Sequence, residues 1–374
     1  MDDLNNNNPL NYNKRQFWAY KRLHTAKGSH DSDKSCKKKS KKIFHVVNGR
    51  IATDRELTKR LDTMYIPPAY KNIVIAKSAN NKIQAIGIDK KGRKQYMYNQ
   101  SFIAKRNDRK YDDILELGKK IITIENDNIS SLRALAKKSY SQYVFPDDYI
   151  PIIVHMLRSY HFRIGNEKYA RENNSHGITT LKSNHIKFHG PTKFTIEFIG
   201  KKGIVNTYTD DNELMASILK KLIKHYPENN NTNNGSKENF LFSYKAPTGG
   251  TPLLITPDHI QTFFQDKYNS YITPKMFRTW YGNYHMIEHL RNLYNQGKLQ
   301  YRMNKSDISN TIKNCSEHVS SKLNNTPTIS KKSYIDNKLL DLVMKNPYRM
   351  AAHIPDNKED QHKYLYKIIM KLRV

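Results

Sequence analysis

The sequence predicts an α+β protein with a small β-rich N-terminal region followed by a larger, mainly helical region. Three observations predict this organisation. Two hairpin patterns lie between residues 43 and 98, apolar residues recur with helical spacing after about residue 109, and a basic segment of low complexity precedes both. A chain of 374 residues is long enough for about two domains and a substantial hydrophobic core.

Residues 1–42 are expected to form a basic, disordered tail. The segment is rich in Asn, Lys and Ser, and it ends in a run of lysines at 37–42 that only Ser40 interrupts. A charge run of this kind is typically solvated. Its side effect would be non-specific affinity for DNA.

Residues 43–108 are expected to form a β-rich DNA-binding domain. Asn48-Gly49 separates two apolar runs, which is the strongest short signal for a hairpin. A second hairpin is predicted by strands over 82–88 and 93–98 with a turn between them. Alternation along the returning strand places Tyr96 and Tyr98 on one face and Met97 on the other.

Residues 109–374 are expected to form the mainly helical domain. A polar loop is predicted over 228–236, where Asn dominates. Thr273-Pro274 has the form of an N-cap followed by proline at the first helical position. Helical spacing is found over 112–122, 130–136, from Pro151 onward, from Pro274 onward and over most of 338–374.

Two β segments interrupt this helical domain. Residues 177–181 have the composition of a strand, and residues 193–199 and 204–208 are expected to pair as a hairpin. Lys201 and Lys202 lie on the glycine-flanked turn of that hairpin. A lysine at such a tip can reach away from the sheet toward a ligand.

The net charge of +30, from 64 Lys and Arg against 34 Asp and Glu, predicts a polyanionic partner. Double-stranded DNA is the obvious candidate, because neutralising its phosphates releases condensed counterions. Cys36 and Cys315 are too few for a disulfide framework or a cysteine zinc cluster. No HExxH spacing, P-loop, membrane span or signal peptide is evident, so we expect a soluble protein of a reducing compartment.

Four residues match the chemistry of metal-free phosphodiester cleavage. Such cleavage needs a nucleophile, positive charge on the phosphate oxygens and a proton for the leaving oxygen. Tyr334 can supply the nucleophile, Arg163 and Arg278 can bind the non-bridging oxygens, and Lys201 can act as general acid. Spacing alone does not bring these residues together.

Several stretches resemble the type IB DNA topoisomerases, most closely the small poxvirus-type enzymes. Together, and in this order, they form a highly specific signal over about residues 43–343. The stretches are Gly87–Tyr98, Phe162–Gly165 with Lys168-Tyr169 and Gly177–Leu181, Phe198–Lys201, Ile272–Thr279 and Thr326–Tyr334.

The resemblance implies a clamp around duplex DNA, with the β-rich domain on one side and a catalytic domain of the tyrosine recombinase/topoisomerase kind on the other. It implies that Tyr334 attacks one strand and leaves a 3′-phosphotyrosyl link and a free 5′-hydroxyl. The nicked duplex would rotate and then be resealed. No ATP, metal or other cofactor is implied, and the enzyme would act as a monomer.

The chain departs from the family pattern at two positions. Asn325 occupies the place of a histidine that donates a hydrogen bond to a non-bridging oxygen, so we expect a neutral donor there. Asn166 replaces a lysine that contacts bases in poxvirus relatives. The DNA-binding residues implied by the matching positions are Lys91, Arg93, Gln95, Tyr96, Tyr98, Asn166, Lys168, Tyr169 and Lys275.

Two alternative functions are compatible with these residues. A tyrosine site-specific recombinase shares the arginine, lysine and tyrosine chemistry but normally assembles as a tetramer. A non-catalytic basic DNA-binding protein would form no covalent adduct. The Asn- and Lys-rich composition fits an AT-rich, viral genome, which predicts a place in the virion or at viral replication sites, and otherwise in the nucleus or nucleoid.

Overall fold

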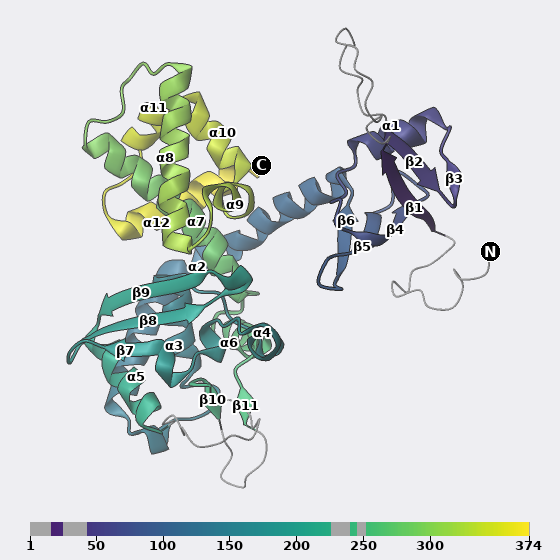
Figure 1. The fold of residues 1–374 in the computed structure, drawn as a ribbon. Coiled ribbons are helices and arrows are strands. Elements are labelled where there is room, and N and C mark those ends of the chain that lie inside the picture. Colours follow the sequence, from purple (N-terminus) through teal and green to yellow (C-terminus); the bar gives the residue numbers. More distant parts are fainter. Residues whose placement is uncertain (1–15, 25–42, 226–239, 245–251, 374) are drawn as a thin grey trace, which may run out of the picture. The chain divides into compact units, whose positions relative to one another are not determined.

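The chain divides into two units in a computed structural model, Met1–Arg109 and Lys110–Val374 (Figure 1). The structure describes residues 16–24, 43–225, 240–244 and 252–373. The polar loop predicted over 228–236 lies outside the described residues, as does most of the predicted tail.

The first unit is built on a six-stranded antiparallel sheet with the strand order β3-β2-β1-β4-β5-β6. Its strands are β1 (Phe17–His24), β2 (Ile43–Val47), β3 (Arg50–Ile51), β4 (Lys71–Ala76), β5 (Ile83–Ile88) and β6 (Lys94–Tyr98). The predicted hairpins at Asn48-Gly49 and at Asp89–Gly92 are confirmed as β2–β3 and β5–β6.

Strand β1 corrects the prediction of a disordered tail. Phe17–His24 lies in the middle of the sheet, paired with β2 on one side and β4 on the other. Tyr20 from this strand is buried in the core of the unit. The prediction rested on the composition of the whole segment, which a short apolar run among Asn and Lys residues hardly changes. Pairing with β2 and β4, which lie far away in the sequence, is what makes this run a strand.

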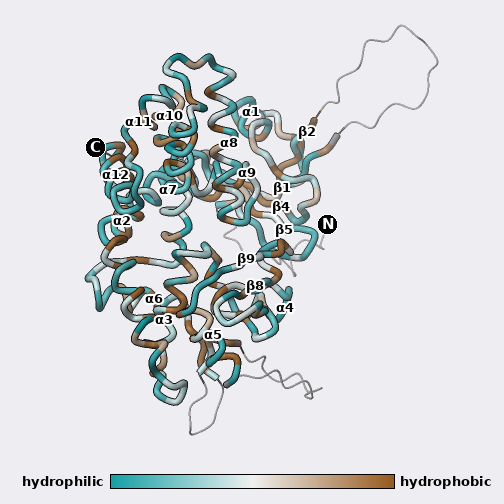
Figure 2. Tube along the Cα trace, turned by 90° about the vertical axis from the view of Figure 1, so that its left-hand side faces the viewer, coloured by the Kyte–Doolittle hydropathy of each residue, from teal (hydrophilic) through white to brown (hydrophobic). Residues whose placement is uncertain are grey.

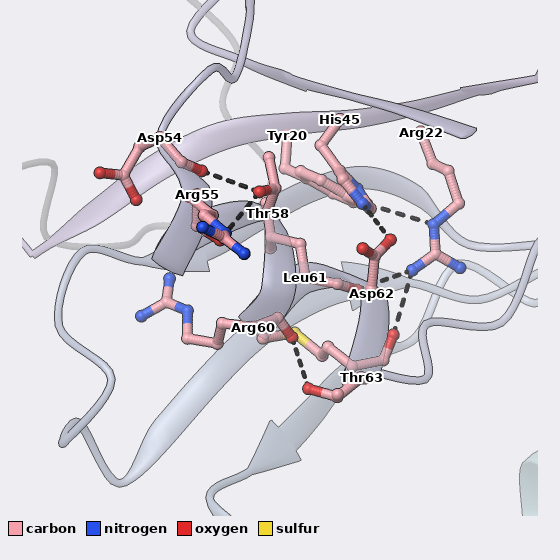
Figure 3. A network of polar contacts seen from close by, with 11 residues as sticks. Tyr20, Arg22, His45, Asp54, Arg55, Thr58, Arg60, Leu61, Asp62 and Thr63 are labelled. Atoms are coloured by element: carbon pink, nitrogen blue, oxygen red, sulfur yellow. Dashed lines mark hydrogen bonds and ion pairs between the residues drawn. The ribbon is translucent and has the colours of Figure 1, made fainter. Parts of the chain in front are cut away.

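Helix α1 (Arg55–Thr63) covers the sheet and is joined to it by polar contacts (Figure 3). Asp54 caps its N-terminus by accepting from the Leu57 amide at 2.6 Å. At the other end, Arg22 of β1 donates to the carbonyls of Leu61 and Met64 at 3.2 and 3.1 Å. These bonds add a donor to carbonyls of the last turn and the C-cap of the helix, where intrahelical partners run out.

A buried histidine extends the same network. His45 of β2 contacts the Tyr20 hydroxyl and the Asp62 carboxylate, both at 2.8 Å (Figure 3). Burial raises the pKa of Tyr20 above its ordinary value, although the hydrogen bond and charge of Arg22 oppose the shift. The network fixes α1 against β1 and β2.

The second unit begins within α2 (Gln100–Lys137), a helix of 38 residues that starts in the first unit. The two helical stretches predicted over 112–122 and 130–136 are parts of this single helix. The other α-helices described in the second unit are α3 (Ile150–His155), α4 (Glu167–Asn173), α5 (Glu213–His225), α6 (Pro257–Tyr268), α7 (Pro274–Asn295), α8 (Lys305–Leu323), α9 (Pro327–Ser333), α10 (Asn337–Lys345), α11 (Pro347–Ala352) and α12 (Lys358–Lys371).

A three-stranded antiparallel sheet, β7-β8-β9, lies within this helical unit (Figure 1). It consists of β7 (Ile186–Phe188), β8 (Lys193–Ile199) and β9 (Val205–Asp211), so the hairpin with Lys201 at its turn is confirmed. The strand predicted over 177–181 is wrong, because Ile178–Thr180 forms a 3₁₀ turn. Its amides instead bond to the carbonyls of Arg163 and Ile164.

Helix α7 forms the centre of the unit. Figure 2 shows hydrophobic and hydrophilic residues alternating along α7 and α8, and the face of α7 that carries Trp280 and Ile287 is fully buried. The Trp280 indole donates to His362 of α12 at 3.1 Å, and Tyr281 donates to the partly buried Glu125 of α2 at 2.6 Å. These partners tie α2 and α12 to the central helix.

Candidate active site

Tyr334 lies at the C-terminal end of α9, a helix of seven residues. Thr326 begins the helix as its N-cap and accepts from the Ile329 amide at 3.3 Å, with Pro327 at the first helical position. The Tyr334 amide still bonds to the Ser330 carbonyl at 2.9 Å. The predicted nucleophile, Tyr334, therefore directly follows the last turn of a short, well-capped helix.

The backbone on both sides of Tyr334 is held by side chains from two other helices. On α7, Asn283 donates to the Tyr334 carbonyl at 3.0 Å and accepts from the Asp336 amide at 2.8 Å. On α2, Lys110 donates to the Ser333 carbonyl at 2.8 Å, and the Tyr111 hydroxyl donates to the Ile335 carbonyl at 2.5 Å. Three consecutive carbonyls are thereby fixed.

Arg278 is buried on α7 and directed at Tyr334. Its Nη2 donates to the Leu323 carbonyl at 2.7 Å, and its Nη1 donates to the His161 carbonyl. Its Nε lies 3.5 Å from the Tyr334 hydroxyl, and its guanidinium carbon lies 5.1 Å from the centre of the Tyr334 ring. The backbone bonds hold the guanidinium rigid, so little side-chain entropy would be lost on binding a phosphate.

Arg163 and Asn325 form the second part of the cluster. Nη2 of Arg163 donates to Oδ1 of Asn325 at 2.8 Å. Since a guanidinium can only donate, this bond fixes the orientation of the Asn325 amide. Nδ2 of Asn325 is buried without a hydrogen-bond partner among the described residues. An unpaired buried donor beside two arginines is suited to an anionic oxygen.

The arginines change the acidity of the phenol. Burial raises the pKa of Tyr334, but the charge and hydrogen bond of Arg278, with the charge of Arg163, bring it below its ordinary value of 10. Burial also lowers the pKa of Arg278 to about 10, with a further contribution from Arg163. Arg278 therefore stays charged at neutral pH, and the phenolate of Tyr334 is stabilised.

Lys201 makes no contact with this cluster that the described structure records. It is exposed on the turn between β8 and β9, at the start of a 3₁₀ turn in which Lys202 has a left-handed backbone. No described contact joins Lys201 to Tyr334, Arg163 or Arg278. Its predicted role as general acid would require the turn or the substrate to bring its ammonium to the scissile phosphate.

Predicted DNA-binding residues of the β5–β6 turn and of β6 are held in place by one carboxylate. Asp89 accepts from the side chains of Arg93 and Gln95, each at 2.9 Å, and its other oxygen accepts from the Lys91 amide. The hydrogen bond from Arg93 lowers the pKa of Asp89 to about 2, so the carboxylate is charged at neutral pH.

The aromatic residues of the same strand form a half-exposed face. Tyr96 and Tyr98 stack with their ring centres 6.4 Å apart, and Arg106 lies 5.6 Å from the Tyr98 ring. Met97 packs on the opposite side against the core that contains Ile75, which confirms the predicted alternation.

The remaining predicted DNA contacts lie on the second unit. Asn166 is the N-cap of α4 and accepts from the Tyr169 amide at 3.2 Å, so this side chain already has a structural role. Tyr169 and Lys168 of α4 are exposed, and Lys168 lies 3.8 Å from Glu172. Lys275 is exposed on the first turn of α7. Whether these side chains contact bases stays a prediction.

Three residues of the site were missed by sequence reasoning, namely Lys110, Tyr111 and Asn283. Lys110 and Tyr111 lie more than 220 positions from the carbonyls that they contact. Neither belongs to a motif, and a lysine followed by tyrosine is common in this chain. Asn283 gave a weak signal, because it is a polar residue on the apolar side of α7.

Comparison with known proteins places these residues in a family context. The family described as eukaryotic DNA topoisomerase I, catalytic core, matches residues 99–360. The family described as bacterial DNA topoisomerase IB, N-terminal domain, matches residues 43–89. The first match alone covers more than half of the chain and contains all five predicted catalytic positions.

Similar full-length proteins come from viruses. DNA topoisomerase 1B of Acanthamoeba polyphaga mimivirus is 29% identical over 333 residues, which cover 88% of this chain and 91% of the relative. DNA topoisomerase I of Monkeypox virus and DNA topoisomerase 1B of Vaccinia virus (strain Copenhagen) are each 27% identical over 303 residues, covering 78% of this chain and 84% of the relative.

Proposed function

The chain belongs to the type IB DNA topoisomerases, and from that premise we propose that it relaxes supercoiled duplex DNA through a transient 3′-phosphotyrosyl bond at Tyr334. The observation that carries the assignment to these residues is the cluster itself. A phenol of lowered pKa, a rigid buried arginine and a second arginine with its amide partner meet at one point, although they come from distant parts of the chain.

The cleavage step follows from the chemistry of this cluster. The Tyr334 oxygen attacks phosphorus, the phenolic proton is lost, and a P–O bond to tyrosine replaces the P–O bond to the 5′-oxygen. Arg278 and Arg163 bind the non-bridging oxygens and stabilise the charge that develops on them. The leaving 5′-oxygen takes a proton, which we assign to Lys201.

Religation is the reverse reaction. The free 5′-hydroxyl attacks phosphorus, and the phenolate of Tyr334 leaves. The charge of the two arginines favours this step as well, because it lowers the pKa of the departing phenol. The energy of the broken bond is kept in the phosphotyrosyl link, so the cycle needs no nucleotide hydrolysis.

The asparagine at 325 completes the phosphate site in this proposal. Its buried Nδ2 would donate to a non-bridging oxygen while Oδ1 stays on Arg163. The exposed tyrosines and basic residues of β6 and α4 would contact the duplex. That the two units grip DNA from two sides, and that one molecule suffices, remain predictions from the family resemblance.

The viral relatives suggest which DNA the enzyme acts on. All three compared proteins are viral, so we propose that this enzyme acts on viral DNA. Its location, in the virion or at replication sites, stays a prediction. No helix in the described part of the chain is long and apolar enough to cross a membrane.

The decisive experiment is relaxation of negatively supercoiled plasmid in EDTA without ATP, with denaturant trapping of covalent complexes. We expect relaxation, an adduct at the 3′-phosphate, and loss of both in Tyr334→Phe with DNA binding retained. Tyr271→Phe is the matched control, because Tyr271 is an exposed tyrosine outside the cluster.

Other outcomes would separate the alternatives. Binding without an adduct in the wild-type protein would indicate a non-catalytic DNA-binding protein. Strand exchange between two duplexes by a tetramer would indicate a recombinase. An adduct that persists in Tyr334→Phe would show that another residue is the nucleophile.

A further inference from the structure

Three side chains of the kinds that bind metal ions lie close together on α7 and α8. His285 and Glu288 are one turn apart on α7, and His318 projects from α8. Nδ1 of His285 lies 2.8 Å from Oε2 of Glu288, and Nε2 of His318 lies 4.0 Å from the same oxygen. The three ligand atoms all lie within 4.8 Å of one another.

We propose that His285, Glu288 and His318 bind one divalent cation of the zinc class. This inference goes beyond the proposed strand cleavage and does not depend on it. Two imidazoles and one carboxylate form a ligand set typical of zinc. Such a set favours late first-row metals over Mg²⁺ and Ca²⁺, which prefer oxygen ligands.

The spacing of the ligand atoms fits a tetrahedral site. Bonds of about 2.0–2.2 Å to nitrogen and oxygen place the ligand atoms of a tetrahedral zinc about 3.3–3.6 Å apart. The observed 2.8 Å and 4.0 Å lie on either side of this value, so small rotations of the side chains would suffice. Three protein ligands leave the fourth position for water.

The unmet hydrogen-bonding capacity of the cluster supports a cation. Nε2 of His318 is buried without a hydrogen-bond partner among the described residues. It lies 4.0 Å from the Glu288 carboxylate, beyond hydrogen-bond reach.

An outer partner orients one of the ligands. Nε2 of His285 lies 2.8 Å from Nε2 of His161. If the Nε2–H of His285 is the donor in this bond, Nδ1 keeps its lone pair and faces Glu288 as a metal ligand. A ligating histidine that donates through its other nitrogen is the usual arrangement at metal sites.

His289 shows that proximity alone does not define a ligand here. Its ring lies parallel to that of His318, with the centres 4.2 Å apart, and its Nε2 contacts Asn314 at 2.6 Å. Two stacked rings cannot direct their lone pairs at one ion between His285 and Glu288. His289 therefore serves as a control residue.

The cation would brace the arginine cluster without taking part in the chemistry. His161 has a left-handed backbone at the end of the π-helical turn Met156–Tyr160, and its carbonyl accepts from Arg278. Arg163 follows two positions later. An ion bound to His285 would add to contacts that already hold this segment, so relaxation in EDTA, which removes the ion, is still expected.

The test is metal binding by the purified full-length protein, without DNA. Metal-free protein is titrated with Zn²⁺ and, separately, with Co²⁺, whose visible absorption distinguishes tetrahedral from octahedral coordination. We expect one tight site with the intense bands of tetrahedral Co²⁺ and a Tm that rises with Zn²⁺. Glu288→Gln and His318→Ala should each weaken zinc binding at least about tenfold and abolish these bands, with a smaller rise in Tm.

Controls keep the result interpretable. His289→Gln should retain the site, and His161→Gln should weaken it about 10–100-fold as loss of an outer partner. Circular dichroism verifies that each variant is folded. Wild-type protein that shows only octahedral Co²⁺, or binding that is the same in Glu288→Gln and His318→Ala as in wild type, would overturn the proposal. Because no DNA is present, failure here leaves the assignment of strand cleavage untouched.

Discussion

Arg163 donates a hydrogen bond to Oδ1 of Asn325 at 2.8 Å, and this contact leaves the amide nitrogen of Asn325 buried and unpaired within the described structure. A histidine is usual at this position in the resembling family. In the proposed site, the asparagine provides one donor for a phosphate oxygen, while its acceptor orients an arginine. Compared with a histidine, Asn325 cannot carry a positive charge, but it still offers a hydrogen-bond donor that can bind the phosphate.

Asn325→Ala is expected to slow cleavage by roughly one to two powers of ten. The physical reason is the loss of one hydrogen bond to a charged group, worth about 1.5–3 kcal/mol. The measurement is the single-turnover rate of adduct formation on a suicide substrate. Asn325→His should remain active, because imidazole can donate to the same oxygen.

Asn325→Asp is the sharper control for that prediction. It keeps the acceptor for Arg163 but replaces the amide donor with a carboxylate, which repels the phosphate. We expect cleavage at least as slow as in Asn325→Ala. If Asn325→Ala folds normally and cleaves at the wild-type rate, the side chain only shapes the turn before Pro327.

The pH dependence of cleavage should report the lowered pKa of Tyr334. The phenol is an acid, so a lowered pKa means that the phenolate forms at lower pH than in free tyrosine. The cleavage rate should rise with pH and level off below the ordinary phenol pKa of 10. In Arg163→Ala, which removes one of the charges that lower this pKa, the plateau should move to higher pH.

A pH–rate profile of single-turnover cleavage for both proteins makes this test. Arg163→Lys is the charge-preserving control and should keep the plateau near its wild-type position while the rate falls. Identical profiles for wild type and Arg163→Ala would mean that ionisation of Tyr334 does not limit cleavage.

The role of Lys201 as general acid can be tested by changing the leaving group of the substrate. Lys201→Ala should slow cleavage of an ordinary phosphodiester far more than it weakens DNA binding, because the proton is needed only in the transition state. A substrate with sulfur in place of the 5′-oxygen leaves as a thiolate and needs no acid. Its cleavage should be largely rescued in Lys201→Ala.

Lys202→Ala is the matched control, because Lys202 lies on the same exposed turn. It should cleave both substrates at nearly the wild-type rate. Absence of rescue in Lys201→Ala would assign the proton to another residue, and rescue in Lys202→Ala would assign it to Lys202.

Local sequence predicts the parts of the fold that depend on local forces. The turn of the β2–β3 hairpin is predicted by Asn48-Gly49, and the two faces of β6 are predicted by the alternation around Met97. Both features are decided within a few residues of the chain. Thr273-Pro274 begins a helix as predicted. Thr326-Pro327 begins α9 in the same way, although no helix was predicted there. The helices from 338 onward also follow from local spacing, and α10 has a clear apolar face.

Long-range pairing decides the parts that sequence reasoning missed. Strand β1 is stable because β2 and β4 pair with it, not because of its flanking composition. Ile178 and its neighbours have strand-like composition, but they bond to the carbonyls of Arg163 and Ile164 as a 3₁₀ turn. Tyr111 meets Ile335 only in the folded chain. Only the family resemblance linked Arg163, Arg278 and Tyr334 before the structure did.

The close packing of Gly282 beneath Tyr334 gives the last prediction. Gly282 lies on α7, and a Cβ at this position would stand 2.9 Å from both the Cβ and the carbonyl oxygen of Tyr334. Real Cβ atoms essentially never approach so closely, and the carbonyl is held in place by Asn283. Gly282→Ala must therefore displace the nucleophile segment.

We expect Gly282→Ala to slow cleavage by about 10–100-fold, because misplacing a reacting group by about 1 Å can cost about 10²-fold. Overpacking should also lower the free energy of unfolding by about 1–3 kcal/mol, while the better helix propensity of alanine returns about 0.5–1 kcal/mol. Gly190→Ala is the control, because nothing lies within 4 Å of the position that its methyl group would take. Single-turnover cleavage and urea unfolding measure the two effects separately. Wild-type cleavage by a folded Gly282→Ala protein would show that the position of Tyr334 tolerates this shift.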